Sequence, residues 1–524
     1  MLSKEILTDV VPLISIEEDL DSVQYTMEHL EEMGLIKIDF LGLRNLSIIA
    51  EIVEDIKKNE EFNLNSISLS DPKTFSYINR GDTLGVFQLE SAGMTNLVKK
   101  LKPSIFEEIA MAIALFRPGP MENIPKFLEN HEHPENVTYL HEDLRPILKE
   151  TYGIIVYQEQ ILSIARKIAG FTYGKADVLR RAMSKKKEKE LIALHDDFIN
   201  GCINNHYSRE TAEEIYALIL KFADYGFNKS HSIVYALIAY QMAYLKANYP
   251  LYFYKALLNG VISSELKTYQ YIGEIQKNSI KILAPDLNNS GIYYMIEQNS
   301  LRMPFTIIKE VGNSSAAAII REREENGPFK NYEDALRRLN KISVGKNVAL
   351  NLISAGAFDS FGLNRETMTR NYDNVSEFVS MIADYSLFNS DFDPTPQLIT
   401  YADKPQTVAE REKEVYGFYF SVNPILQHKQ SLGIVCPTLL ELQNMKGYVK
   451  GFGHIDRIKE HKTKNGEWMA FADLSDGTGD YSLAIMPNVY RQHETVLAKG
   501  KYVSFSGKSD KDGSCLVREL SVIE

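Results

Sequence analysis

The segment GLIKIDFLGL, residues 34–43, places a single carboxylate, Asp39, among leucine, isoleucine and phenylalanine. If this segment is a strand, its side chains alternate between two faces, so Lys37 and Asp39 share one face at a spacing of about 6.5 Å. Ile36, Ile38 and Phe40 would share the other, apolar face, which predicts a buried strand. The charged pair at its end has two interpretations. It is either a structural ion pair at the edge of a sheet, or a metal-binding carboxylate beside a lysine that binds phosphate.

Five stretches further along the chain are rich in polar or cationic residues, and four of them also carry aromatic residues and glycines. They are GVFQLESAGM (85–94), ALFRPGPM (114–121), YGIIVYQEQI (152–161), LRRAMSKKK (179–187) and YGFNKSHSIVYALIAYQ (225–241). Cations and amides bind phosphates, whereas aromatic side chains stack on bases. Arg180 and Arg181 could hold an anion with planar guanidinium groups, and Lys229 and His231 could donate to it as point donors. The alternatives are a solvated helix face for the cations and a hydrogen-bonded core position for His231.

The chain has 524 residues and a net charge of −12, which argues against a general nucleic-acid binder. Its positive charge is concentrated locally, because RRAMSKKK at 180–187 carries five cations and no acid. A basic patch on an acidic protein can still follow a phosphate backbone. Lys185, Lys186 and Lys187 are therefore predicted DNA contacts.

The three cysteines, Cys202, Cys436 and Cys515, show neither a zinc-site spacing nor a disulfide framework. This usage, together with an N-terminus that has no signal-peptide character, predicts a cytoplasmic protein. The longest apolar stretch, SIVYALIAYQMAYLKANYP, is interrupted by polar residues and predicts a buried helix, not a membrane span.

The residue pattern predicts a multidomain, mainly α protein with a small α/β part at its N-terminus and an all-β domain at its C-terminus. Strand, loop and helix are expected in the first part, helices in the next two, weak order in the fourth, and about five alternating strands in the last. Five such strands in some 80 residues fit a small barrel such as an OB-fold. The parts are residues 1–55, 56–275, 276–360, 361–435 and 436–524.

Two glycine-turn units, IIKEVGNSSAAAII and NLISAGAFDSFG, lie in the third part. They resemble helix–hairpin–helix elements, whose turn amides could point at DNA phosphates. Gly312 and Gly356 are therefore candidate DNA contacts, and helix packing alone is the alternative.

The peptide DYSLF lies in the weakly ordered part and ends with an apolar pair that could fill a hydrophobic pocket on a partner. The alternative is that this pair anchors the loop to its own domain. The residues of the peptide are Asp384, Tyr385, Ser386, Leu387 and Phe388.

Taken in order, six motifs resemble the C-terminal half of the bacterial DNA polymerase III alpha subunits, which are C-family replicative polymerases. The motifs are IKIDFLGL, GVFQLES followed by GM, FRPGP, YGIIVYQEQ, LRRAMSKKK and FNKSHS followed by YA. Each motif alone is weak, but six in order over about 200 residues are specific, and the resemblance covers nearly the whole chain.

The resemblance implies template-directed nucleotidyl transfer from deoxynucleoside triphosphates to a primer 3′-hydroxyl, with two Mg²⁺ ions. It implies that Asp39 is the third metal-binding aspartate of the palm and that Lys37 lies near the triphosphate. Arg180 and Arg181 would hold the incoming triphosphate. The FNKSH stretch, with Lys229, Ser230 and His231, would belong to the same pocket.

The same resemblance implies the order of the domains and their partners. DYSLF would be a degenerate sliding-clamp motif, with Asp384 where glutamine is usual. The implied partners are primer–template DNA, the sliding clamp, other replisome subunits and single-stranded DNA at the OB-fold, with no membrane. The implied domains are the end of the palm (1–55), fingers (56–275), tandem helix–hairpin–helix (276–360), clamp-binding segment and linker (361–435) and OB-fold (436–524).

One departure from the family pattern is large. The other two metal ligands form an Asp-x-Asp pair upstream of this segment, and the DLD at 19–21 and DFD at 391–393 are poor substitutes because neither lies on an apolar strand. The chain is therefore expected to be a fragment that is inactive alone and belongs to a complete polymerase. The alternative is a non-catalytic DNA- and clamp-binding module.

Overall fold

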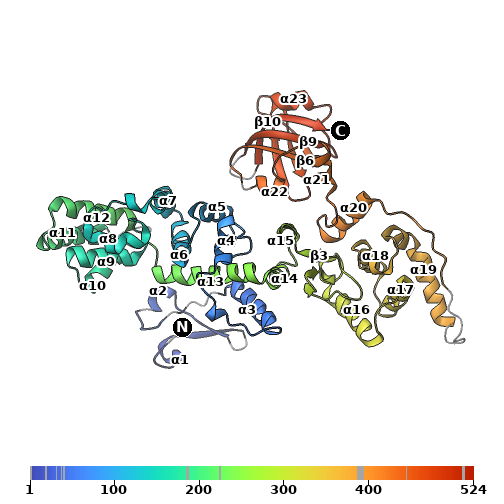
Figure 1. The fold of residues 1–524 in the computed structure, drawn as a ribbon, viewed down its shortest axis with the longest axis horizontal. Coiled ribbons are helices and arrows are strands. Elements are labelled where there is room, and N and C mark those ends of the chain that lie inside the picture. Colours follow the sequence, from blue (N-terminus) through green and yellow to red (C-terminus); the bar gives the residue numbers. More distant parts are fainter. Residues whose placement is uncertain are drawn as a thin grey trace. The chain divides into compact units, whose positions relative to one another are not determined.

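The computed structural model describes residues 3–17, 20–30, 32–36, 38, 42–184, 188–223, 226–385, 395–443, 445–509 and 514–523. Its internal contacts divide the chain into two units, Met1–Ala50 and Glu51–Glu524 (Figure 1). Each unit is described by itself. Among the described residues, no helix combines the length and the apolar character that a membrane crossing requires.

The first unit is small and has little core. Its elements are α1 (Leu7–Val10), β1 (Leu13–Glu17), β2 (Leu20–Val23), α2 (Met27–Leu30) and the start of α3 (Arg44–Lys57). β1 and β2 form an antiparallel pair, and the core cluster contains Val11, Leu30 and Leu35.

The expectation of a buried apolar face at residues 34–43 is wrong for the described residues Ile36 and Ile38, which are 61% and 42% exposed. Both residues lie outside the strands β1 and β2, and the described core cluster of this unit does not include them. The helix expected after this segment is confirmed as α3.

Helices dominate residues 51–277, as the sequence predicts. The α-helices that follow α3 are α4 (Pro72–Arg80), α5 (Ala92–Leu101), α6 (Phe106–Leu115), α7 (Ile124–Glu132), α8 (Arg145–Leu148), α9 (Gln158–Ala169), α10 (Tyr173–Ser184), α11 (Glu188–Asn204), α12 (Arg209–Ala223), α13 (Lys229–Asn248), α14 (Pro250–Gly260) and α15 (Glu265–Lys277). Short 3₁₀ turns connect them: η1 (Leu64–Ser66), η2 (Pro120–Asn123), η3 (Pro134–Asn136), η4 (Glu142–Leu144) and η5 (Lys149–Thr151).

Helix α13 is the central element of this region. It begins at an Asn228 N-cap, whose side chain accepts from the His231 amide, and it packs against α4 and α6. Its middle and C-terminal turns are buried, as expected for a helix that is apolar nearly all round. Its one fully buried cation, Lys246, donates to the Leu84 carbonyl and pairs with Glu274 of α15.

The next region combines a small sheet with four helices. Strand β5 pairs in parallel with β3 and antiparallel with β4. The elements are β3 (Lys281–Leu283), β4 (Met295–Glu297), β5 (Ser300–Arg302), η6 (Phe305–Ile307), α16 (Asn313–Asn326), α17 (Tyr332–Lys341), α18 (Lys346–Ser354), η7 (Asp359–Phe361) and α19 (Arg365–Tyr385).

The C-terminal region confirms the predicted barrel of about five strands. Within the described residues, β6 to β10 close in the order β10-β8-β7-β6-β9, with β8 and β10 parallel. This arrangement, with a helix between the third and fourth strands, is that of a five-stranded OB-fold barrel. The elements are α20 (Pro405–Tyr416), α21 (Pro424–Ser431), α22 (Leu439–Leu442), β6 (Gly447–Lys462), β7 (Trp468–Ser475), β8 (Asp480–Ile485), α23 (Pro487–His493), β9 (Tyr502–Ser509) and β10 (Ser514–Ile523).

Candidate functional site

The five polar stretches noted in the sequence converge around the N-termini of α9 and α13. The backbone of Tyr157 forms a parallel bridge with that of Phe227. In this bridge the Gln158 amide donates to the Phe227 carbonyl at 2.9 Å, and the Phe227 amide donates to Val156 at 3.0 Å. This bridge joins the stretch at 152–161 to the stretch at 225–241, although some 70 residues separate them.

Aromatic contacts bring two more stretches to the same place. The Arg117 guanidinium lies 3.9 Å from the centre of the Phe227 ring. The Tyr235 ring stacks on His231 at 4.1 Å and contacts Phe87 at 5.2 Å. Cation–π and ring contacts of this kind fix planar groups in place. They leave the exposed His231 side chain at the rim of the cluster.

The predicted cations Arg180 and Arg181 lie on α10, and both contact one carboxylate. Arg180 donates through Nε and Nη2 to Asp177 Oδ1 at 2.9 and 2.8 Å, and Arg181 Nε lies 3.0 Å from Asp177 Oδ2. Arg180 also donates through Nη1 to Gln158 Oε1 at 3.2 Å. This last contact joins α10, and hence the stretch at 179–187, to the first residue of α9.

The predicted Lys229 begins α13 and has two acidic neighbours. Its ammonium lies 2.7 Å from Glu150 Oε2, and its backbone amide donates to Glu159 Oε2 at 3.0 Å. The Asn228 side chain donates to the other Glu159 oxygen at 3.0 Å. The lysine also lies over the Tyr157 ring, and burial raises the pKa of Tyr157 above its usual range, so this phenol stays neutral.

The described contacts therefore gather five cationic or imidazole side chains around the starts of α9 and α13; this group, here called the pocket rim, is Arg117, Arg180, Arg181, Lys229 and His231. The residues come from α10, the start of α13 and the loop before η2. Their guanidinium, ammonium and imidazole groups suit a ligand that carries several phosphates and one aromatic base. Ser230, the remaining predicted pocket residue, is exposed in the first turn of α13.

Sequence reasoning did not single out Arg117, Gln158, Glu159 or Asp177 as site residues. Arg117, Gln158 and Glu159 lie inside the quoted stretches, and Asp177 lies three residues before Arg180; these positions are the signal that could have found them. Their partners, however, depend on contacts between distant segments, which spacing along one chain does not reveal.

Several predicted site residues lie outside the described residues, so the structure leaves their roles as predictions. For Asp384 and Tyr385, which close α19, only the backbone is described. The others are Lys37, Asp39, Lys185, Lys186, Lys187, Ser386, Leu387 and Phe388.

The predicted Mg²⁺ site cannot be built from the described part of the chain. No group of three or more histidine, cysteine or acidic residues within it could hold a metal ion. Asp39 would supply one carboxylate, which is too few for two ions that each take several oxygen ligands.

Two hairpins in the region of α16 to α18 have the same geometry. Gly312 is the N-cap of α16 and Gly345 is the N-cap of α18, both with extended backbones. The residues two positions earlier, Glu310 and Ser343, both adopt positive φ, at 66° and 61°. A Cβ built on either glycine meets no atom within 4 Å, so both helix N-termini are open to a phosphate.

Gly356 has a different environment from Gly312. Its amide donates to the Ile353 carbonyl at 2.9 Å. A Cβ there would lie 2.3 Å from Arg365 Nη2 and 2.8 Å from Asp359 Oδ2, at a φ of +83°. DNA contact by Gly356 stays a prediction, and this enclosed geometry gives it no support. The counterpart of Gly312 is Gly345, which the repeated VG dipeptides at 311–312 and 344–345 could have indicated.

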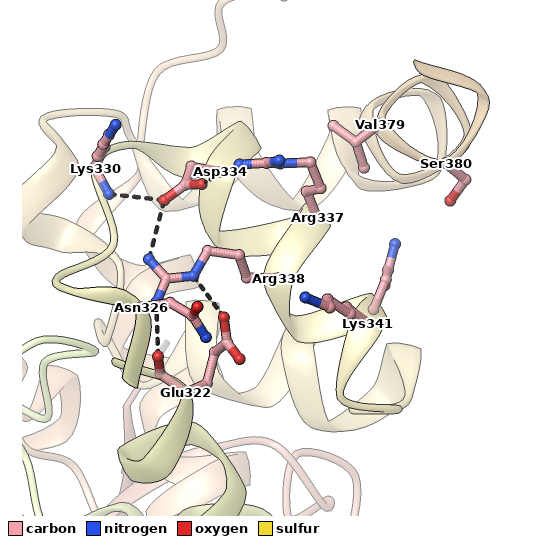
Figure 2. Close-up of a pocket in the computed structure, with 10 residues that line it drawn as sticks. Glu322, Asn326, Lys330, Asp334, Arg337, Arg338, Lys341, Val379 and Ser380 are labelled. Carbon is pink, nitrogen blue, oxygen red and sulfur yellow. Dashed lines mark hydrogen bonds and ion pairs between the residues drawn. The ribbon is translucent and has the colours of Figure 1, made fainter. Parts of the chain in front are cut away.

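A polar cavity of about 560 Å³ lies among α16, α17 and α19 (Figure 2). Arg338 forms its floor, 7% exposed, and pairs with Glu322 Oε1 at 2.9 Å. It also donates to the carbonyls of Glu322, Gly327 and Pro328 and to Asp334. The five N–H groups of the guanidinium are thus engaged, and carbonyls from the end of α16 point at it. The cavity is therefore explained by capping of α16.

The β6–β7 hairpin of the barrel carries exposed aromatic residues and cations on both of its faces; this set, here called the barrel face, is Lys459, His461, Lys462, Trp468 and Phe471. Trp468 and Phe471 are 49% and 46% exposed. In the antiparallel β6–β7 pair, Lys462 lies opposite Trp468 and Lys459 lies opposite Phe471. Because side chains alternate along a strand, the first pair points to one side of the hairpin and the second pair to the other. Exposed rings beside cations are the elements that bind single-stranded nucleic acid.

Two protein-family models match regions of the chain that are described above. Residues 45–206 match the family model of the bacterial DNA polymerase III alpha subunit finger domain. Residues 279–368 match the model of the helix-hairpin-helix motif. The first match contains α10 and the second contains both hairpins.

Curated relatives match nearly the whole chain. The DNA polymerase III subunit alpha of Bacillus subtilis (strain 168) is 44% identical over 522 residues, which are 97% of this chain and 46% of the relative. The subunit of the same name from Staphylococcus epidermidis (strain ATCC 12228 / FDA PCI 1200) is 42% identical over 497 residues, which are 93% of this chain and 46% of the relative. The chain therefore spans about half the length of the curated relatives it matches.

Proposed function

We propose that this chain, a homologue of DNA polymerase III alpha subunits, forms the nucleotide-selecting and DNA-holding part of a replicative DNA polymerase. The complete enzyme would act in the cytoplasm and transfer deoxynucleotides to a primer 3′-hydroxyl on a DNA template. The observation that supports the proposal best is the convergence of five distant polar stretches at one pocket rim.

The pocket rim would bind the incoming deoxynucleoside triphosphate. Arg180, Arg181 and Lys229 would hold the phosphates, because charge-assisted hydrogen bonds to phosphate are strong and directional. The stacked pair of His231 and Tyr235 would lie beside the base or sugar. When bound, two Mg²⁺ ions would activate the primer hydroxyl and stabilise the leaving pyrophosphate.

The remaining regions would hold the nucleic acid and the partners. The α16 and α18 N-termini would contact duplex phosphates, and Lys185–Lys187 would extend this contact. The barrel face would stack on single-stranded template. Leu387 and Phe388 would insert into an apolar pocket of the sliding clamp, and other replisome subunits would join the complex.

A non-catalytic DNA- and clamp-binding module remains the second candidate, because the described residues provide no metal site. The two candidates differ in one measurement. In the complete polymerase, Asp39→Asn should lower the rate of primer extension by at least about 10³-fold while DNA affinity changes little. Asp21→Asn is the matched control and should retain the rate. Near-normal extension by the Asp39 variant would favour the second candidate.

A further inference from the structure

The rim cations Arg180, Arg181 and Lys229 lie against carboxylates that the proposed function does not use. Asp177 engages Arg180 through one oxygen and Arg181 through the other. Glu150 engages the Lys229 ammonium at 2.7 Å. We propose that Asp177 and Glu150 are counter-ions that the triphosphate displaces when it binds. This inference rests on the proposed function of the pocket rim.

The pairs are accessible enough to exchange partners. The side chains of Asp177 and Glu150 are 38% and 47% exposed, and those of Arg180 and Lys229 are 27% and 36% exposed. Ion pairs that solvent reaches contribute little to stability, so a stronger ligand breaks them at small cost. A triphosphate brings about four negative charges and more acceptor oxygens than a carboxylate, so it is the stronger ligand.

The counter-ions have a definite effect on the empty pocket. Without them, adjacent cations at Arg180 and Arg181 would repel each other and attract any anion in the cell. With them, the cations are held near their working positions, and an anion binds only if its contacts exceed those of the carboxylate. The pocket therefore gives up part of its affinity for every anion and favours ligands with several phosphates.

Glu159 has a different role, although it lies in the same place. Its two oxygens accept from the Lys229 backbone amide and from Asn228 Nδ2, and within the described residues it forms no ion pair. It joins the start of α9 to the start of α13, so it is a positioning residue. Removal of its charge should loosen the first turn of α13, whereas removal of a counter-ion should free a cation.

Removal of a counter-ion should raise the affinity of this chain for a triphosphate, whereas removal of the positioning residue should lower it. Isothermal titration calorimetry with dATP, and separately with inorganic tripolyphosphate, should be compared at one ionic strength. We expect Asp177→Asn and Glu150→Gln each to tighten binding by about two- to fivefold, the range that partner removal in an exposed pair permits. We expect Glu159→Gln to weaken it.

Asp197→Asn is the matched control. Asp197 of α11 pairs at 2.7 Å with Lys175, which lies on α10 as Arg180 does. The Asp197 side chain is solvent-exposed, like those of Asp177 and Glu150, but Lys175 is not part of the pocket rim. It should leave the affinity unchanged, and thermal melting by circular dichroism should show all variants folded. Unchanged or weaker binding by both Asp177→Asn and Glu150→Gln would overturn the counter-ion proposal alone. Absence of saturable binding by the unmodified chain would instead refute the pocket itself.

Discussion

The pocket rim and the barrel face are both cationic and aromatic, but they are assembled in opposite ways. The rim joins segments from residue 87 to residue 235, and three of its cations lie against a carboxylate. The barrel face comes from two adjacent strands, and the described structure gives Lys459 and Lys462 no acidic partner. The rim suits one ligand of defined shape and charge, whereas the barrel face suits a flexible strand of any sequence.

The largest expected effect tests whether the two surfaces have separate ligands. Arg180→Ala combined with Lys229→Ala removes two charge-assisted contacts from the rim, so triphosphate affinity should fall by about 100-fold. Calorimetry should show this loss, and single-stranded DNA binding should change little. Lys175→Ala is the control on the same helix. Equal losses for both ligands would mean that the surfaces form one site.

The reverse change should affect only the barrel face. Trp468→Ala combined with Phe471→Ala removes two stacking platforms, each worth about 1–3 kcal/mol for a stacked base. Affinity for an oligothymidylate should fall by at least about 10-fold, and triphosphate binding should stay the same. Trp468 is the single tryptophan of the chain, so quenching of its fluorescence reports stacking directly in the unmodified protein. A saturable complex without quenching would contradict the assignment.

A smaller effect tests whether the cations of the barrel face contact phosphates of single-stranded DNA. Lys459→Ala should lower the slope of log affinity against log salt by about 0.7 for single-stranded DNA, as expected for one lost phosphate contact. Fluorescence anisotropy over a series of salt concentrations measures this slope. Lys446→Ala is the control outside the barrel face. An equal change of the salt slope in this variant would indicate that the overall charge of the protein, and not a contact at Lys459, sets the slope.

The smallest effect concerns the pH dependence of stability, which should differ between the helical region and the barrel. Burial acts to raise the pKa of Glu108, but hydrogen bonds from the Ser104 amide, Tyr152 and His131 outweigh it and hold the pKa below its usual value of 4.5. A group of this kind contributes stability above its unfolded pKa and loses it as the pH falls below that value.

Below about pH 4.5 the helical region should therefore weaken before the barrel does. Far-ultraviolet circular dichroism follows the helices, and Trp468 fluorescence follows the barrel. Glu108→Gln should reduce the acid sensitivity of the helical signal, and an unchanged acid midpoint in this variant would assign the sensitivity to other carboxylates.

The secondary structure that carries the barrel face could be predicted from the sequence, whereas the contacts that assemble the pocket rim could not. The strand β7, which contains both Trp468 and Phe471, follows from local alternation and turn residues. The helices of the rim also follow from local periodicity, and α13 is the buried helix that its apolar pattern predicts. The contacts of Arg180 with Gln158 and of Lys229 with Glu159 depend on tertiary packing, so spacing could not have revealed them.

Two sequence predictions show the limits of pattern reading more directly. Ile36 and Ile38 alternate as residues of a buried strand would, yet both are exposed and lie outside the strands β1 and β2. Gly356 follows a helix as a hairpin glycine would, yet Arg365 fills the space beside it. In both cases the missing information was the identity of the neighbour, which a one-dimensional pattern does not contain.

Helix α13 extends from the pocket rim to a buried ion pair near its other end. Its twenty residues span about 30 Å, with Lys229 at one end and the buried Lys246–Glu274 pair near the other. A tilt of only about 5° about the buried end would carry the rim end through about 2.6 Å. A tilt about the buried end would therefore move the rim residues while the Lys246–Glu274 contact with α15 stays in place.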